Sequence, residues 1–259
     1  MADADWVRYR QIRGKTLPDH VRILGASYRL ERLLKRDFYA VTGVYQRDSA
    51  TSAPPSPVLL KVYHTDSFAL LPLGWLGRWL CRREVRFFKT LDAIAGIPRF
   101  LERFGRSGYV REYMPGQNLR DFLREGHVPH QSFFPRLQAI LHEVHRRGVS
   151  HNDLSKPENV LVQPDGSPGL IDFQIALRLG SGPCRALKYP ILRYMQKVDR
   201  YHVTKRHRRC RPSDFTAEEL ADTRRKGVLL TLHAVIRRPY RAVRHFILNR
   251  FLLKDTAAK

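Results

Sequence analysis

The order of apolar and polar residues in the first quarter of the chain predicts β-strands. Apolar residues recur from Tyr28 onward, and residues 38–45 are rich in β-branched and aromatic side chains. Together they predict a hairpin that turns near residues 35–37. A loop rich in proline and serine, residues 49–57, separates this hairpin from residues 58–63, which predict a buried strand with one lysine.

Further along, the spacing of apolar residues changes to the period of an α-helix. Residues 85–94 show this spacing, and so do residues 118–124 and 132–147, with Gly148 as a helix stop. Between them, residues 109–114 predict the end of a strand. A sheet followed by helices is therefore expected in this half of the chain.

Residues 68–80 are rich in leucine and aromatic side chains and allow two interpretations. In the first, which we favour, they pack in the core and bury Trp75 and Trp79. In the second, they rest on a lipid surface, because aromatic and basic residues are enriched where proteins meet the headgroups. The basic residues that would hold the segment there are Arg78, Arg82 and Arg83.

The chain has 259 residues, enough for one large domain or two small lobes, and a net charge of +23 at pH 7. Such an excess predicts an anionic partner, namely a nucleic acid, an anionic membrane surface or a phosphorylated substrate. Residues 200–211 form a dense basic run, and residues 228–236 and 240–253 are basic and amphipathic. Few aromatic residues in the run argue against binding of single strands, but phosphate contacts to RNA stay open.

Several classes of protein are disfavoured. No run of 18 apolar residues exists, so a membrane span is not expected, and the first ten residues lack the apolar segment of a signal peptide. The cysteines Cys81, Cys184 and Cys210 are far apart, which predicts neither a disulfide framework nor a zinc site. We expect a cytoplasmic protein, either soluble or bound peripherally at the inner face of the membrane.

A candidate reaction site lies in residues 149–173. Asp153 lies in a predicted loop beside a histidine and an asparagine, and a lysine and a second asparagine follow it. After a predicted turn, Asp172 ends an apolar run. Two carboxylates, an amide and an ammonium group that a hairpin brings together have the chemistry to bind Mg²⁺ and a nucleotide and to transfer a phosphoryl group.

The other parts of such a site occur upstream in a suitable order. Lys61 on its predicted strand would contact the α- and β-phosphates, and Glu84 on the next helix would hold that lysine by an ion pair. Asp153 would accept or orient the proton of the attacking hydroxyl. Asp172 would hold Mg²⁺, with help from Asn159. Each residue alone has an ordinary structural explanation, but the joint order, with about 90 residues from Lys61 to Asp153, argues against coincidence.

These motifs resemble those of the protein-kinase-like superfamily over about residues 28–180. Residues 151–159, HNDLSKPEN, resemble the catalytic loop, and residues 171–174, IDFQ, resemble the metal-binding motif. The resemblance implies the use of ATP and Mg²⁺. It also implies an α+β, two-lobed kinase-like fold, with a small antiparallel-sheet N-lobe and a helical C-lobe extended by basic C-terminal helices.

The strand end at residues 112–114 resembles the hinge between the two lobes. By that resemblance, the Glu112 carbonyl and the Met114 N–H would face adenine. Asn118 or Asp121 would then reach the ribose.

Within the superfamily the chain is similar to the atypical bacterial branch, the RIO-like and lipopolysaccharide-core kinases. No GxGxxG precedes Lys61, so the chain lacks the glycine-rich loop whose backbone amides cover the phosphates in common kinases. The basic tip at residues 35–37 either takes over that role or is a solvated turn. Asn152 stands where an arginine that binds a loop phosphate is common, and activation by loop phosphorylation is therefore not expected. Gln174 replaces the glycine of the metal-binding motif, which implies a short activation segment.

The catalytic loop is one residue longer than the common one, because Asn159 follows Asp153 by six positions rather than five. Either Asn159 still reaches the metal through a bulge, or Glu158 or a water takes its place. Lys156 is the candidate to neutralise the γ-phosphate during transfer.

We expect residues 1–27 to form an N-terminal arm, residues 28–114 the N-lobe with the hinge, and residues 115–259 the helical C-lobe. The expected activity is transfer of the γ-phosphate of ATP to a hydroxyl by an atypical serine/threonine protein kinase. One alternative is a kinase of a lipid-linked lipopolysaccharide-core sugar at the inner membrane surface. Another is a pseudokinase that binds nucleotide without turnover. An anionic membrane or RNA is a further candidate partner for the basic C-terminal helices.

Overall fold

A computed structural model describes residues 17–36, 40–48, 57–64, 74–178 and 185–222. The chain divides into two compact units, residues 1–206 and residues 207–259. The predicted turn at residues 35–37, most of the loop at residues 49–57 and the basic segments at residues 228–236 and 240–253 lie partly or wholly outside the described residues. Among the residues that are described, no helix is both long enough and apolar enough to cross a membrane.

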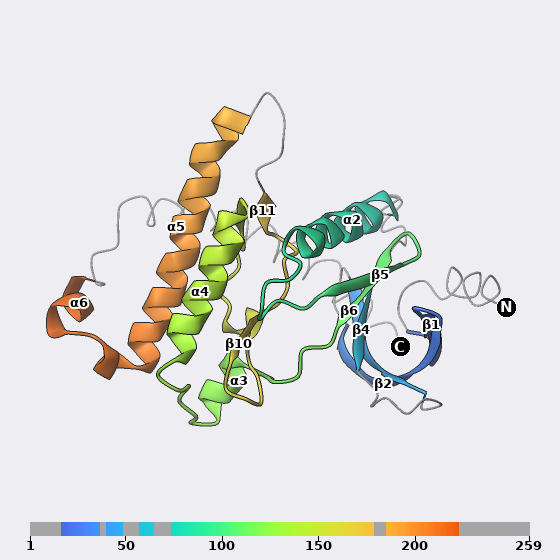
Figure 1. The fold of residues 1–259 in the computed structure, drawn as a ribbon, viewed down its shortest axis with the longest axis horizontal. Coiled ribbons are helices and arrows are strands. Elements are labelled where there is room, and N and C mark those ends of the chain that lie inside the picture. Colours follow the sequence, from blue (N-terminus) through green and yellow to red (C-terminus); the bar gives the residue numbers. More distant parts are fainter. Residues whose placement is uncertain (1–16, 37–39, 49–56, 65–73, 179–184, 223–259) are drawn as a thin grey trace, which may run out of the picture. The chain divides into compact units, whose positions relative to one another are not determined.

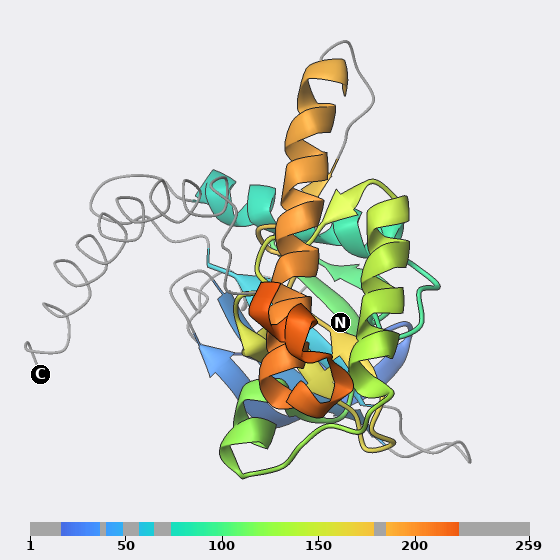
Figure 2. The same cartoon turned by 90° about the vertical axis from the view of Figure 1, so that its left-hand side faces the viewer.

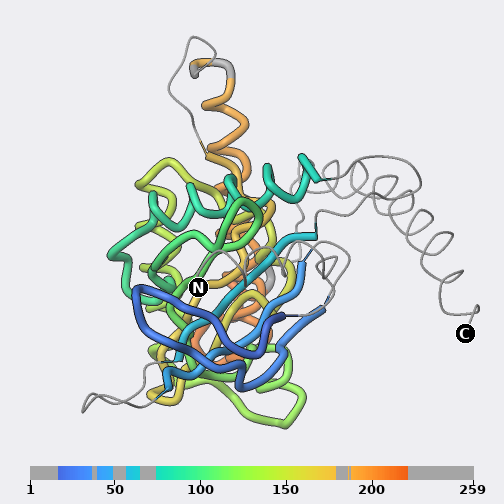
Figure 3. Tube along the Cα trace, turned by 90° about the vertical axis from the view of Figure 1, so that its right-hand side faces the viewer, coloured from blue at the N-terminus to red at the C-terminus, as the bar shows by residue number. Residues whose placement is uncertain are grey.

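The first unit begins with a six-stranded antiparallel sheet in the order β1-β2-β3-β4-β6-β5 (Figures 1 and 3). Its strands are β1 His20–Ile23, β2 Ala26–Arg36, β3 Ala40–Arg47, β4 Val58–Tyr63, β5 Phe100–Phe104 and β6 Gly108–Glu112. The predicted hairpin is the β2–β3 pair, and the predicted buried strand is β4. β1 and the start of β2 fall within residues 1–27, the range expected as an arm. This part of the range is a strand pair of the sheet, because Val21, Ile23 and their neighbours are buried in its apolar core.

One helix, α2 Gly74–Thr90, packs on β4, β5 and β6 (Figure 1). It is continuous through Gly77, and its buried face follows the helical period through Cys81, Val85 and Phe88. Trp75 and Trp79 lie on another face and are 60% and 47% exposed. The favoured interpretation, in which both tryptophans pack internally, is therefore wrong.

A mainly helical part follows the sheet. The predicted helices at residues 118–124 and 132–147 are α3 Leu119–Arg124, which Asn118 caps, and α4 Phe133–Arg146. Short strand pairs connect them to the candidate site. These strands are β7 Gln117–Asn118, β8 Val149–Ser150, β9 Val160–Val162, β10 Pro168–Leu170 and β11 Leu177–Arg178. The antiparallel sheet with one helix and the helical part after it form the α+β, two-lobed arrangement that was expected.

The longest helix, α5 Arg185–Cys210, was not predicted. The sequence pattern indicates only a basic run in the second half of this helix, because Pro190 and many charged residues obscure the apolar stripe. α5 runs beside α4 in two views, and Gln196 donates hydrogen bonds to the carbonyls of His145 and Val149 at 3.0 and 3.2 Å (Figures 1 and 2). α5 therefore packs against the end of α4 and the strand that leads into the candidate site.

The second unit is described over residues 207–222, with the 3-10 turn Pro212–Asp214 and α6 Ala217–Asp222. Thr216 and Glu219 form a capping box at the start of α6. The Thr216 N–H donates to Glu219 Oε2 at 2.8 Å, and the Glu219 N–H donates to Thr216 Oγ1 at 3.3 Å.

Candidate active site

Lys61 and Glu84 form a buried ion pair between the sheet and α2. The Lys61 Nζ lies 2.8 and 3.2 Å from the two carboxylate oxygens of Glu84, which is 1% exposed. Tyr63 points to the same side of β4 two residues later, and its hydroxyl donates to the same carboxylate. Burial and the neighbouring Glu84 charge raise the pKa of Tyr63 well above its ordinary value, so the hydroxyl stays a donor. The predicted lysine–glutamate pair is present.

Asp172 lies on the other side of this lysine, with Oδ1 3.8 Å from the Lys61 Nζ. Burial acts to raise the pKa of the Asp172 carboxyl. The positive charges of Lys61 and Lys35 act in the opposite direction and outweigh burial, so the pKa lies below its ordinary value. Asp172 is therefore ionised at neutral pH.

The loop that carries Asp153 accommodates its extra residue. Asn159 donates from Nδ2 to the Asp153 carbonyl at 3.1 Å, and Lys156 Nζ lies 2.6 Å from Asp153 Oδ2. Glu158 turns toward α3, where it lies 2.5 Å from Arg120. Asn159, and not Glu158, therefore lies beside Asp153.

The backbone of this loop is fixed by Asp199 of α5, which the sequence analysis missed. Its carboxylate accepts the N–H groups of His151 at 2.7 Å and Asn152 at 2.8 Å, and it also accepts from His145 Nε2 at 3.1 Å. Asp199 is 1% exposed. It is the single acidic residue of a strongly basic helix, and this was the signal that could have identified it.

Three more contacts join the Asp153 loop, α2 and the Asp172 segment. His151 Nε2 donates to the Ile171 carbonyl at 3.0 Å, and Asn152 Nδ2 donates to the Ile175 carbonyl at 3.2 Å. From α2, Arg83 donates to the Ala176 carbonyl at 2.6 Å. Asn152 thus makes a structural contact at the position where a phosphate-binding arginine is common, and Arg83 is engaged within the fold.

The proposed hinge follows β6, the strand beside the one that carries Lys61. Glu112 pairs with Val58, and its carbonyl accepts a hydrogen bond from the Arg111 side chain at 3.2 Å. A Cβ placed on Gly169 of β10 would lie 2.2 Å from the Met114 sulfur, so the thioether packs directly on that glycine. No contact of Glu112 or Met114 with Lys61, Asp153 or Asp172 is found among the described residues.

Asn118 and Asp121, the expected ribose contacts, hydrogen-bond to each other. Asn118 accepts the Asp121 N–H at 3.0 Å and donates from Nδ2 to Asp121 Oδ2 at 2.7 Å. This arrangement is a helix cap at the start of α3, which accounts for Asn118 in structural terms.

The oxygen atoms available at the site suit Mg²⁺, which prefers one or two carboxylates together with phosphates and water. Asp172 Oδ1 is buried and has no hydrogen-bond partner among the described residues. Asn159 uses its Nδ2 for Asp153, which leaves its Oδ1 as a neutral acceptor. In the described part of the chain no cluster of three His, Cys, Asp or Glu could hold a metal. The donor set therefore fits a metal that is held jointly with phosphates.

Comparisons with known proteins find kinases. The chain is 33% identical over 127 residues to the serine/threonine-protein kinase pkn2 of Myxococcus xanthus. This match covers 46% of the present chain and 15% of pkn2. It is 36% identical over 105 residues to the maternal embryonic leucine zipper kinase of Danio rerio, covering 38% and 15%. It is 34% identical over 102 residues to the CBL-interacting protein kinase 16 of Oryza sativa subsp. japonica, covering 37% and 22%.

These similarities support the protein-kinase-like superfamily for this chain. The matched regions span less than a quarter of each of these relatives, and none of the three is named as a RIO-like or lipopolysaccharide kinase. No protein-family model matches the chain.

Proposed function

We propose that the chain is an ATP- and Mg²⁺-dependent phosphotransferase that acts as a serine/threonine protein kinase. The observation that carries the proposal is the joint placement of Lys61 against both Glu84 and Asp172, with Asp153, Lys156 and Asn159 held in the adjoining loop. The lack of a glycine-rich loop, together with Asn152 and Gln174, supports the finer proposal of an atypical, RIO-like kinase.

Each residue has a role that its surroundings allow. When bound, Mg²⁺ neutralises charge on the phosphates, and Asp172 Oδ1 and Asn159 Oδ1 are the atoms that would hold it. Lys61, which Glu84 orients, would bind the phosphates, and Glu112 and Met114 would contact the adenine. Asp153 would accept the proton of the acceptor hydroxyl on Oδ1, because Oδ2 faces Lys156. Lys156, with a half-exposed side chain, would neutralise charge on the transferred group.

Two alternatives remain within the same site. A pseudokinase needs no proton acceptor, and the buried Asp153 beside Lys156 and Asn159 argues for turnover instead. The second alternative, a lipid-linked sugar as acceptor, differs from a protein acceptor in the cell fraction that becomes labelled.

The test is incubation with γ-labelled ATP and Mg²⁺, alone and with soluble or membrane fractions. We expect label on a protein in the soluble fraction or on the chain itself. The Asp172→Asn variant should lose the label, and Asp92→Asn should keep it, because Asp92 is exposed on the loop after α2. Label on a lipid extract would favour the sugar kinase. Equal labelling by Asp172→Asn and the unchanged protein would contradict the proposed function.

A further inference from the structure

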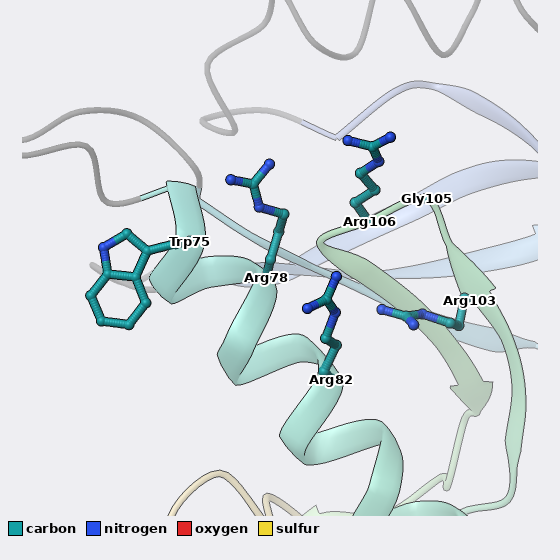
Figure 4. Close-up of a pocket in the computed structure, with 6 residues that line it drawn as sticks. All are labelled: Trp75, Arg78, Arg82, Arg103, Gly105 and Arg106. Carbon is teal, nitrogen blue, oxygen red and sulfur yellow. The ribbon is translucent and has the colours of Figure 1, made fainter.

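A cavity of about 530 Å³ lies in the first unit, between the first half of α2 and the turn that joins β5 to β6 (Figure 4). It includes none of the candidate active-site residues. The residues that line it are Trp75, Arg78, Arg82, Arg103, Gly105 and Arg106. Four of these six residues are arginines, and none is acidic.

The arginines come from two elements. Arg78 and Arg82 rise from α2, and Arg103 and Arg106 rise from the β5–β6 hairpin (Figure 4). Among the residues that the structure describes, no carboxylate forms an ion pair with any of the four. Arg83, the neighbour of Arg82, is by contrast used within the fold through its bond to Ala176.

Such an arrangement does not stabilise the fold by itself. Arg78 and Arg82 are four residues apart on one helix, a spacing at which like charges repel each other. The two arginines on the hairpin add positive charge across the cavity from them. Arg103 interacts with the side chain of Cys81, which is not an anion at neutral pH because burial raises the pKa of its thiol. An anion inside the cavity would convert the repulsion into attraction on both sides, because the guanidinium groups would then have an acidic partner.

The chemistry of the lining selects the type of anion. Guanidinium groups bind phosphate through paired N–H donors, and several of them suit a doubly charged phosphomonoester better than a singly charged group. The volume is within the range of about 300–1,000 Å³ that small-molecule sites occupy, and a bare phosphate would not fill it. Trp75, exposed at the margin, offers an apolar surface to whatever carries the phosphate.

We propose that this cavity is a binding site for a phosphomonoester carried on a larger molecule, separate from the nucleotide site. A soluble phosphorylated compound and a phosphorylated lipid headgroup share this chemistry. The proposal does not depend on the proposed kinase activity, because binding alone tests it.

The experiment measures binding of two probes to the full chain at about 0.15 M salt, where the Debye length is about 8 Å and general attraction to a basic protein is reduced. The soluble probe is glycerol 3-phosphate, a phosphomonoester, followed by titration calorimetry. The lipid probe is a phosphatidylcholine vesicle that contains phosphatidic acid, compared with a vesicle of equal surface charge that contains phosphatidylglycerol, which lacks a phosphomonoester.

The test variant removes one arginine from each wall, Arg82→Gln with Arg106→Gln. Its matched control, Arg29→Gln with Arg193→Gln, removes the same charge from exposed positions on β2 and α5. We expect at least about tenfold weaker binding in the test variant, since each charge-assisted hydrogen bond is worth about that much. The control should bind like the unchanged protein.

A second double variant, Arg78→Gln with Arg103→Gln, should lose probe binding to the same extent. An equal loss in both double variants would exclude a structural disturbance confined to Arg82 and Arg106 as its cause. Binding of glycerol 3-phosphate alone identifies a soluble ligand, and preference for phosphatidic acid vesicles identifies a lipid. Three results would overturn the proposal: no binding of either probe, equal loss in the test and control variants, or equal binding to phosphatidic acid and phosphatidylglycerol with no response to glycerol 3-phosphate.

Discussion

At the scale of single residues, Asp199 determines how the loop around Asp153 is held. One buried carboxylate accepts two consecutive backbone N–H groups and a histidine. Buried N–H groups without an acceptor are costly, so the loop conformation around Asp153 depends on a side chain far along the chain. The loop could be predicted from the sequence because its residues are contiguous. Asp199 could not be connected to it, because Asp199 lies 46 positions after Asp153 and no local pattern joins them.

The Asp199→Asn variant tests this dependence. An amide has one acceptor oxygen, so at least one of the N–H groups of His151 and Asn152 loses its partner. We expect the free energy of unfolding to fall by about 1–3 kcal/mol, measured by urea denaturation. The exposed control Asp92→Asn should change it little. Equal stability of the two variants would show that Asp199 does not hold the loop.

Lys61 provides a second test at this scale, through pH. Removing one partner of a buried ion pair costs about 3–5 kcal/mol, and Glu84 is almost fully buried. The Lys61→Met variant should therefore be less stable at pH 7 by about that amount, whereas Lys197→Met on the exposed side of α5 should not.

The pH dependence follows from the lowered pKa of Asp172. A carboxylate whose folded pKa is below its unfolded value stabilises the fold above the unfolded pKa. That contribution is lost as the pH falls through the folded pKa. The stability difference between Lys61→Met and the unchanged protein should therefore shrink below about pH 4, as Asp172 takes up its proton. A difference that is constant from pH 7 to pH 3 would contradict this electrostatic account.

At the scale of elements, the strands and the shorter helices could be predicted and the longest helix could not. The β2–β3 hairpin, β4, α3 and α4 have clear local periods. α5 has a proline near its start and is dominated by basic residues, so its buried positions do not stand out. The faces of α2 were misassigned for a related reason. Its tryptophans are apolar, but the helical period turns them away from the sheet.

The connection after β6 gives a prediction at this scale. Gly116 has φ +137, and a Cβ there would lie 2.4 Å from the Val162 carbonyl oxygen on β9, which is backbone and cannot move aside easily. Gly126 also has a positive φ, +84, but has open space around it. Gly126→Ala should cost about 1–2 kcal/mol from backbone strain alone, and Gly116→Ala should cost about 1–3 kcal/mol more.

Urea denaturation of the two alanine variants measures this difference. Both glycines have a positive φ, but that of Gly116 lies further from the left-handed helical region that other residues tolerate, so the difference reports the extra backbone strain at Gly116 together with its close approach to β9. Equal destabilisation would mean that β9 does not approach Gly116 as the structure shows.

At the scale of the whole molecule, the fold class could be predicted, and the candidate site could be proposed from short motifs in a fixed order. The motifs placed Lys61, Glu84, Asp153, Asn159 and Asp172, and the structure brings them into two linked clusters. The arginine-lined cavity could not be predicted, because its two walls are far apart in sequence and no motif marks them. The identity of the acceptor likewise depends on surfaces that no local pattern describes.

The central claim is that this site transfers the γ-phosphate with Asp153 as the proton acceptor. Its most direct test is one comparison of Asp153→Asn with the unchanged protein, measuring both Mg²⁺-ATP affinity and turnover of γ-labelled ATP. The account predicts unchanged nucleotide affinity and a loss of turnover of about 10²–10⁴-fold. Nucleotide binding without any turnover by the unchanged protein, or equal turnover in the variant, would contradict it.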